Sequence, residues 1–407
     1  MHVLFVEPSF PYNQKQHVRA LKEVGARVTG IGERPVDYLS DDVKSWLDGY
    51  EQVPSVVHEG AMLDAVRKIQ KRGPWVDRLE ASVEAHILPV AKVREACGIP
   101  GTSVKTAWLC RDKPAMKEAL RQGGIPCAQS TGTDDPQEAR AFAERVGYPL
   151  IFKPRSGAGA AGTQRVDSDR DLEHAINEHR LGHGGTVAIE EFIEGHEGFW
   201  DTLAVDGKPE HEFISHYYPR VLDAMRHRSI NPYFITTNRV DAESYGEVRT
   251  LGRKVLGILG IGTSATHMEW FFGPKGLKFS EIGCRPPGVG VWDIYSAANG
   301  LDLYREWAMT IVHGHRGDRA SRQFSAGMLA LRPNRDGRIA GYQGIDELQR
   351  RYGQCVIDTH LPPPGSPTQP VEGGYMANAW VRMRHPDYDE LRNILETVGK
   401  TLKVFAQ

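Results

Sequence analysis

The chain has 407 residues, with apolar and charged fractions of 40% and 25% and a formal net charge of −2. This length and composition are typical of a globular protein with several layered units, since single domains run to about 100–200 residues. The near-neutral charge disfavours nucleic acid as a partner, and the absence of any stretch near ~20 apolar residues disfavours a membrane span.

The five cysteines are odd in number, widely spaced and free of any C-x-x-C pair: Cys97, Cys110, Cys127, Cys284 and Cys355. This distribution disfavours both a disulfide framework and a zinc site, and it favours a reducing compartment. Residues 1–7 show no basic leader before an apolar core. We therefore expect a cytoplasmic protein.

The first third of the sequence alternates strands and helices. Apolar runs at residues 2–6 and 27–31 predict strands, and periodic segments near 18–24, 61–71 and 81–96 predict helices. Alternation of this kind is typical of a parallel sheet with crossover helices. We expect residues 1–105 to form an N-terminal Rossmann-like α/β domain.

The next ninety residues predict a small α+β unit. Asp112 and Asp135, each close to a proline, stand at helix starts, and Gly123-Gly124 ends the first of these helices. Strands are expected at 149–154, 163–166 and 187–193, with a helix at 168–179. Residues 106–195 are therefore expected to form a small lid domain.

The remaining sequence predicts a larger antiparallel unit and a tail. Asp206-Gly207 between two β-prone runs is a hairpin signal. A helix is expected at 245–259, and strands at 266–272 and 277–282 flank a tight connection. We expect a central domain at 196–323 and a C-terminal subdomain at 324–407 that packs on it.

A glycine-rich loop permits three interpretations. Gly157, Gly159 and Gly162 match G-x-G-x-x-G, but residues 163–166 predict a strand where a dinucleotide fingerprint needs a helix. Thr163-Gln164 stands where a P-loop requires Lys-Ser/Thr. A flap over phosphates remains, and for the loop alone a surface hairpin is equally compatible.

Two lysines strengthen the interpretation of a phosphate site. Lys153 lies four residues before the first glycine, and Lys113 stands just before a predicted helix. An ammonium group can pair with phosphate oxygens as a point charge. Considered alone, either lysine is more typical of a solvated surface charge.

Two glutamates flank the last hairpin at nearly equal distances from its turn. Glu269 and Glu281 are expected to lie opposite each other to within one residue. Such a pair suits Mg²⁺ or Mn²⁺, whereas a solvent-facing hairpin is the alternative. Alternation predicts that each glutamate shares a face with apolar and charged neighbours: His267 and Phe271 with Glu269, and Leu277, Phe279, Gly283 and Arg285 with Glu281. Arg285 could hold a substrate carboxylate or phosphoryl group, or form a salt bridge to Glu281.

Taken in order over residues 1–314, these motifs resemble the ATP-grasp superfamily. The resemblance implies an N-terminal domain, a lid and a central domain, with ATP between the last two. It places Lys113, Lys153, Ser156 and the flap with Gly157, Gly159 and Gly162 on the phosphates, and Glu190, Glu191, Phe192 and Ile193 at the adenine. It also implies that Glu197 binds the ribose, that Glu269 and Glu281 bind Mg²⁺, and that Arg285 stabilises an acyl phosphate. Gly283 departs from the family pattern, which has asparagine there.

The resemblance further implies an ATP-dependent carboxylate–amine ligase of the amino-acid ligase type, acting on small molecules. We also expect a homodimer. A biotin-carboxylase-like enzyme and an ATP-binding sensor without turnover are the alternatives. Ala115-Met-Lys117 mimics part of a biotinylation motif, but it lies in a predicted helix, so we interpret Lys117 as a surface residue. Arg226, His227 and His267 are expected as substrate contacts.

Overall fold

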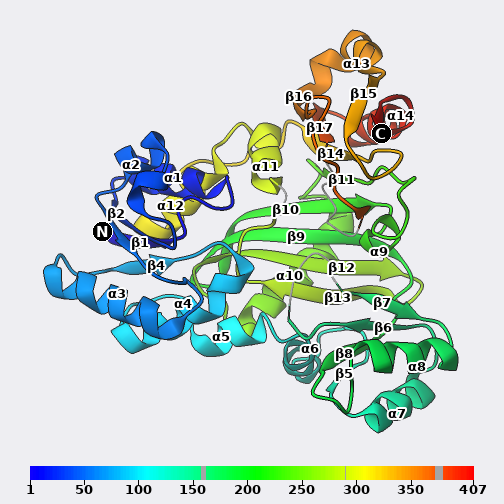
Figure 1. Cartoon of the computed structure of the whole chain (residues 1–407), viewed down its shortest axis with the longest axis horizontal. Coiled ribbons are helices and arrows are strands. Elements are labelled where there is room, and N and C mark those ends of the chain that lie inside the picture. The colour runs from blue at the N-terminus through cyan, green and yellow to red at the C-terminus, as the bar shows by residue number, and fades with distance from the viewer. Residues whose placement is uncertain (157–161, 289, 372–378) are drawn as a thin grey trace.

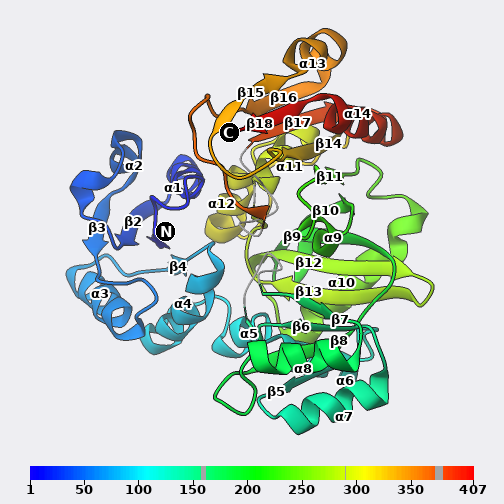
Figure 2. The same cartoon turned by 45° about the vertical axis from the view of Figure 1, so that its right-hand side comes forward.

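The computed structural model describes residues 1–156, 162–288, 290–371 and 379–407, and Figures 1 and 2 show the arrangement of the parts. An N-terminal unit lies to one side of a large central sheet. A small lid unit lies at one edge of that sheet, and the C-terminal elements lie toward the other. Within the described residues no helix combines the length and the apolar composition that crossing a membrane would require.

The N-terminal unit is a parallel sheet of order β3-β2-β1-β4. Its strands are β1 (His2–Val6), β2 (Arg27–Gly32), β3 (Gly49–Gln52) and β4 (Arg78–Glu80). Its helices are α1 (Gln14–Glu23), α2 (Asp41–Trp46), α3 (Glu59–Arg72) and α4 (Glu84–Cys97), and α5 (Val104–Leu109) follows them. β1 is buried on both faces, which explains its continuous apolar sequence. The predicted α/β architecture is confirmed.

The lid is an antiparallel sheet of order β5-β8-β6-β7. Its strands are β5 (Ser130–Thr133), β6 (Leu150–Lys153), β7 (Gln164–Val166) and β8 (Val187–Glu191), with helices α6 (Lys113–Gln122), α7 (Pro136–Val146) and α8 (Asp169–Glu178). Side chains of α7 and α8 bury one face of the sheet around Phe142, Phe152 and Leu172. The opposite face, with Ile151 and Lys153, is therefore left to face a cavity.

Eight antiparallel strands form the central sheet, in the order β13-β12-β9-β10-β11-β14-β17-β16. They are β9 (His196–Val205), β10 (Lys208–Tyr218), β11 (Tyr233–Thr236), β12 (Ser264–Gly273), β13 (Gly276–Gly283), β14 (Ser325–Leu331), β16 (Val356–His360) and β17 (Ala379–His385). Asp206 and Gly207, both at positive φ (48° and 77°), make the turn between β9 and β10. The strands of the sequence tail thus continue the same sheet.

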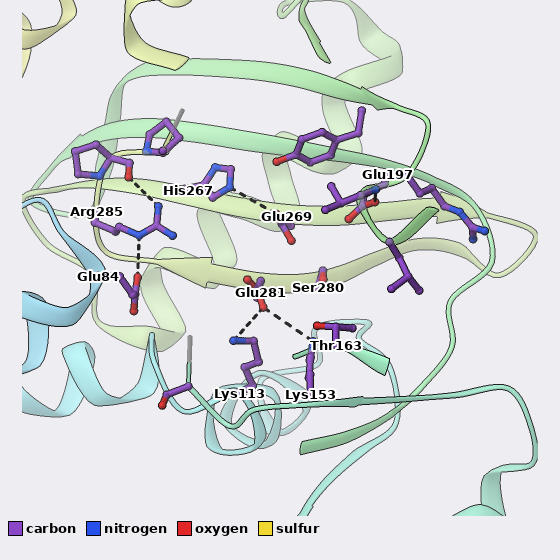
Figure 3. Close-up of a pocket in the computed structure, with 18 of the residues that line it drawn as sticks. Glu84, Lys113, Lys153, Thr163, Glu197, His267, Glu269, Ser280, Glu281 and Arg285 are labelled. Atoms are coloured by element: carbon purple, nitrogen blue, oxygen red, sulfur yellow. Dashed lines mark hydrogen bonds and ion pairs between the residues drawn. The ribbon is translucent and has the colours of Figure 1, made fainter. Parts of the chain in front are cut away.

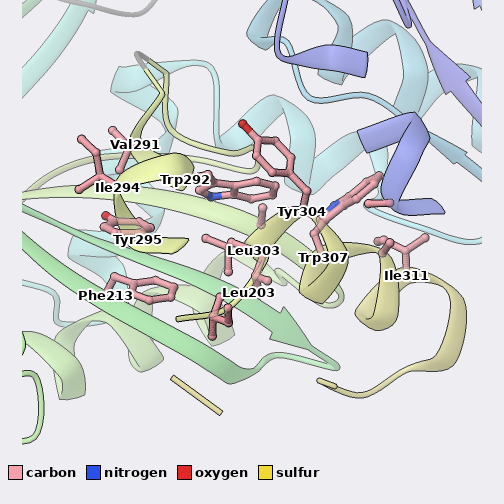
Figure 4. Close-up of a cluster of buried hydrophobic side chains, with 14 of the residues drawn as sticks. Leu203, Phe213, Val291, Trp292, Ile294, Tyr295, Leu303, Tyr304, Trp307 and Ile311 are labelled. Carbon is pink, nitrogen blue, oxygen red and sulfur yellow. The ribbon is translucent and has the colours of Figure 1, made fainter. Parts of the chain in front are cut away.

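Helices cover both faces of the central sheet. α10 (Gly246–Leu259) buries the predicted stripe of Val248, Leu251, Val255 and Leu259 against one face, and the short α9 (Val221–Ala224) follows β10. α11 (Val291–Asn299) and α12 (Leu303–His313) lie on the other face. Figure 4 shows Tyr295 against Phe213, and Trp292, Tyr304 and Trp307 on the side of the N-terminal unit, in a core that also contains Phe5 of that unit. This shared core joins the N-terminal unit to the central sheet.

The C-terminal elements pack at the far edge of the sheet. α14 (Tyr388–Thr401) buries Leu391 and Leu395 against β14 and β17, and α13 (Ile345–Tyr352) lies outside it. β15 (Ile339–Gln343) and β18 (Lys403–Ala406) form a separate two-stranded sheet. The predicted final helix after Asp387 is confirmed, with the Asp387 side chain accepting a hydrogen bond from the amide of Glu390.

Candidate active site

A cavity of about 860 Å³ lies where the lid, the central sheet and the N-terminal unit meet. It is lined by β6 and β8 of the lid, by β12 and β13 of the central sheet, and by the loop before α1. Figure 3 shows charged side chains of β6, β12 and β13 converging on it, together with Lys113 at the start of α6.

The two glutamates lie opposite each other in the β12–β13 ladder, as predicted. The register shifts directly after this pair, so that Trp270 faces Phe279 and Ser280 is the extra residue of a β-bulge. Leu277 and Phe279 therefore lie on the face of Trp270 and pack in the core beneath the sheet, although Phe279 also reaches the cavity wall. Glu281 lies on the opposite face with Glu269 and lines the cavity. The prediction that Leu277 and Phe279 share a face with Glu281 was wrong, because the bulge reverses the alternation.

Two lysines from the lid reach the same glutamate. The Nζ atoms of Lys113 and Lys153 lie 3.4 Å and 4.0 Å from Oε2 of Glu281. Asp112 accepts a hydrogen bond from the amide of Ala115, so it caps α6 and fixes Lys113 in the first turn. Burial alone would raise the pKa of Glu281, but the two ammonium groups hold it below its usual value.

Lys117 is wholly buried, which corrects its interpretation as a surface residue. Its Nζ lies 2.5 Å from Oε2 of Glu190, and Lys153 Nζ lies 2.8 Å from the same oxygen. Burial lowers the pKa of Lys117 to about 8, although Glu190 opposes this shift. Helical spacing could have revealed the residue: Lys113 and Lys117 are four residues apart and must share one face of α6.

The residues expected at the adenine form the end of β8 and the turn after it. Glu190, Glu191, Phe192 and Ile193 all line the cavity. The guanidinium groups of Arg165 and Arg220 lie 4.4 Å and 5.1 Å from the centre of the Phe192 ring and hold it by cation–π contacts. Oε1 of Glu190 is buried without a hydrogen-bond partner.

Glu197 lies at the start of β9, close to the carboxylate pair. Its Oε2 accepts a hydrogen bond of 2.8 Å from the amide of Val221. Burial and the nearby charge of Glu269 raise the pKa of Glu197 to about 8. Three acidic side chains on one face of β9, β12 and β13 thus favour the approach of a cation.

Arg285 follows β13 and is held by the N-terminal unit. Its Nε donates to Oε2 of Glu84 at 2.8 Å, and its Nη1 donates to the carbonyl of Pro286 at 2.8 Å. The salt bridge considered with Glu281 is thus replaced by one with Glu84, and no local pattern in the sequence points to that partner. A Cβ atom at Gly283 would lie 3.5 Å from Oε2 of Glu84, so Glu84 lies beside the missing side chain at that position.

His267 also lines the cavity, between two acidic groups. Its Nδ1 lies 2.7 Å from Oδ1 of Asp201 and its Nε2 lies 3.6 Å from Oε1 of Glu269. Burial would lower the pKa of His267, but Asp201 and Glu269 raise it to about 9. Tyr295 donates a hydrogen bond of 2.6 Å to the second oxygen of Asp201 and fixes it. Asp201 is a further site residue that the sequence did not indicate.

Two predicted substrate contacts lie elsewhere. Arg226 and His227 are exposed in the loop after α9 and do not line the cavity, whereas Arg220 at the start of that helix does. The strongly charged stretch around them made the three indistinguishable in sequence. Of the predicted flap, Ser156 lines the cavity and Gly162 is exposed beside it, while Gly157 and Gly159 lie outside the described residues.

Comparison with known proteins shows that residues 118–299 match the ATP-grasp domain. The chain is 27% identical to the L-arginine-specific L-amino acid ligase of Bacillus subtilis over 77% of this chain and 76% of that protein. It is 25% identical to the 2-oxoglutarate carboxylase small subunit of Hydrogenobacter thermophilus, over 75% of this chain and 67% of that protein. The crystal structure of an L-amino acid ligase from Bacillus licheniformis superposes with a TM-score of 0.76 at 20% identity, covering 100% of this chain and 98% of that one.

Proposed function

We propose that this chain, a member of the ATP-grasp superfamily, is an ATP-dependent ligase that joins a carboxylate to an amine, with an amino acid as one substrate. The observation that supports it most is the arrangement of charge in the cavity. Cations from the lid and Arg285 converge on the face that also presents Glu269 and Glu281. Sequence similarity to an amino acid ligase over three quarters of both chains supports the choice of reaction.

The residues present fit ATP. Oε1 of Glu190 is a buried acceptor without a partner on the cavity wall, which suits a base that carries an amino group. Lys113 and Lys153 would hold the phosphates, and Glu197 would accept hydrogen bonds from the ribose. ATP, when bound, supplies the phosphoryl group that activates the carboxylate.

The residues also fit Mg²⁺ as part of a shared site. Within the described part of the chain, no group of three or more His, Cys, Asp or Glu side chains forms a complete metal site. Mg²⁺ commonly takes one or two carboxylates from the protein and the remaining ligands from phosphates and water. Glu269 and Glu281, opposite each other with hard oxygen donors, would supply those carboxylates, and the ion would neutralise phosphate charge.

The protein's own part in the chemistry is positioning and charge stabilisation. Arg285 would bind the oxygens of the activated carboxylate, and Glu84 fixes the guanidinium plane for that contact. Lys113 and Lys153 would stabilise the negative charge that develops on the phosphates. Enclosure by the lid would exclude water, which would otherwise hydrolyse the acyl phosphate before the amine attacks.

The test is release of ADP and phosphate from Mg-ATP with a panel of amino acids, singly and in pairs, followed by mass spectrometry of the products. We expect ADP release that depends on an amino acid and a product whose mass equals two substrates minus water. ADP release that requires bicarbonate instead would identify a carboxylase. Tight ATP binding without ADP release for any acid and amine would indicate a sensor. A cytoplasmic location and a homodimer belong to the same proposal.

A further inference from the structure

Lys117 is a buried charge that none of the roles above uses. Its side chain is 1% exposed, it lies in the middle of α6, and its ammonium group is 2.5 Å from Glu190. A buried ammonium group is costly unless it is paired, so its presence in the lid needs a reason. An apolar residue would fill this helix position at lower cost.

The reason lies in the shared oxygen. Oε2 of Glu190 accepts both Lys117 and Lys153, at 2.5 Å and 2.8 Å. Lys153 and Glu190 project from neighbouring strands, since Ile151 pairs with Glu190 in the β6–β8 ladder and Lys153 is two residues further on. Without Lys117, the carboxylate of Glu190 would pair with Lys153 and neutralise its charge.

The net charge of the cluster depends on Lys117. The ion pairs connect three lysines, Lys113, Lys117 and Lys153, with two glutamates, Glu190 and Glu281, so the cluster has a net charge of +1. If Lys117 were neutral, the cluster would have no net charge. Glu190 would then compete with a phosphate for Lys153.

We propose that Lys117 is a positioning residue: by neutralising Glu190, it leaves the charge of Lys153 available to the phosphates of a bound nucleoside triphosphate. This inference rests on the proposed binding of ATP but not on the identity of the acid and amine substrates. It predicts that Lys117 acts on the phosphates only, through Lys153, although its own partner, Glu190, would lie next to the base.

The experiment measures binding of ATP and of adenosine to the full chain by competition against a fluorescent ATP analogue. Lys117→Met should weaken ATP binding about ten- to a hundredfold, because one charge is lost from a buried cluster. Adenosine, which has no phosphate, should bind within about threefold of wild type. The ratio of the two affinities therefore reports the phosphate effect alone.

Two further variants sharpen the test. In Glu190→Gln/Lys117→Met the net charge of the cluster returns to +1, so the preference for ATP over adenosine should return to near the wild-type ratio. Lys275→Met is the matched control, since the exposed Lys275 forms an ion pair with Glu191, next to Glu190 in the chain, and not with Glu190 itself. It should leave the ratio unchanged.

Each outcome of this experiment supports or overturns either the proposed function or the role of Lys117. Failure of the wild-type chain to bind ATP would refute the proposed function itself. If wild type binds ATP and Lys117→Met keeps the same ratio, or loses ATP and adenosine binding in parallel, the inference is wrong and Lys117 is only structural. If Lys117→Met does not fold, the double variant still decides, because an unrestored ratio in a folded double variant overturns the inference.

Discussion

Replacing Glu281 with glutamine should change ATP binding in opposite directions with and without magnesium. Glu281 lies 3.4 Å and 4.0 Å from the ammonium groups of Lys113 and Lys153, so in the absence of a metal it competes with phosphate for both. At 4 Å and an effective dielectric constant of about 20, one such pair interacts by about 4 kcal/mol. Because the Glu281 side chain is 27% exposed, only part of this is recovered on substitution. We expect metal-free ATP to bind about tenfold more tightly, which corresponds to ~1.4 kcal/mol.

With Mg²⁺ the effect should reverse, because the variant lacks one of the two carboxylates that face each other across the ladder. ATP affinity should no longer rise on adding Mg²⁺, and turnover should fall by a factor of about 100 or more, as expected when charge stabilisation is lost at the reacting group. Calorimetric titration of the protein with ATP, once in EDTA and once in Mg²⁺, measures the two affinities. Release of ADP measures turnover. Glu173→Gln, at an exposed lid ion pair, is the control. Weaker metal-free binding, or retained turnover, would refute the assignment of Glu281.

Two further predictions concern stability. Gly252→Ala should destabilise the protein by about 1–3 kcal/mol despite the better helix propensity of alanine, because its Cβ would lie 2.5 Å from the buried Trp200 ring. Gly257→Ala in the same helix should stabilise the protein by about 0.5–1 kcal/mol, because its Cβ would meet no atom within 4 Å. Urea unfolding of both variants tests this, and equal signs would contradict it. Burial among aromatic rings lowers the pKa of His17 from 6.5 to about 3. As the pH falls from 6.5, the unfolded chain therefore binds a proton at His17 before the folded chain does, and the folded state loses stability until about pH 3. His17→Phe should flatten the pH dependence of unfolding between pH 6.5 and 4, whereas an unchanged slope would show that other groups cause it.

The sequence predicted features that depend on local pattern. The stripe on α10, the cap of α6 by Asp112 and the turn at Asp206-Gly207 each follow from a few neighbouring residues, and each was found as predicted. A short turn fixes the register of a hairpin, so the local pattern places Glu269 and Glu281 opposite each other to within one residue, and the β-bulge then brings them directly opposite. The β-bulge at Ser280 was not predictable in this way, since nothing in the sequence indicates which residue is left unpaired.

Partners from distant parts of the chain could not be predicted. Glu84 and Arg285 are 201 residues apart, and Asp201 and His267 are 66 apart, so no local pattern connects them. The buried pair of Lys117 and Glu190 was missed for another reason: a lysine in a helix is normally exposed, and only the shared face with Lys113 argues otherwise.

The contact between Glu84 and Arg285 has a consequence for how the site is assembled. Glu84 begins α4 of the N-terminal unit, whereas Arg285 follows β13 of the central sheet. The orientation of Arg285 therefore depends on how firmly the two units are joined, and the join is the core in which Trp292, Tyr304 and Trp307 pack on Phe5 and His17. Loosening that core at Tyr304 or Trp307, neither of which lines the cavity, would therefore displace Glu84. Substitutions there should therefore reduce turnover more than ATP binding, because the lid lysines that would hold the phosphates do not rest on this core.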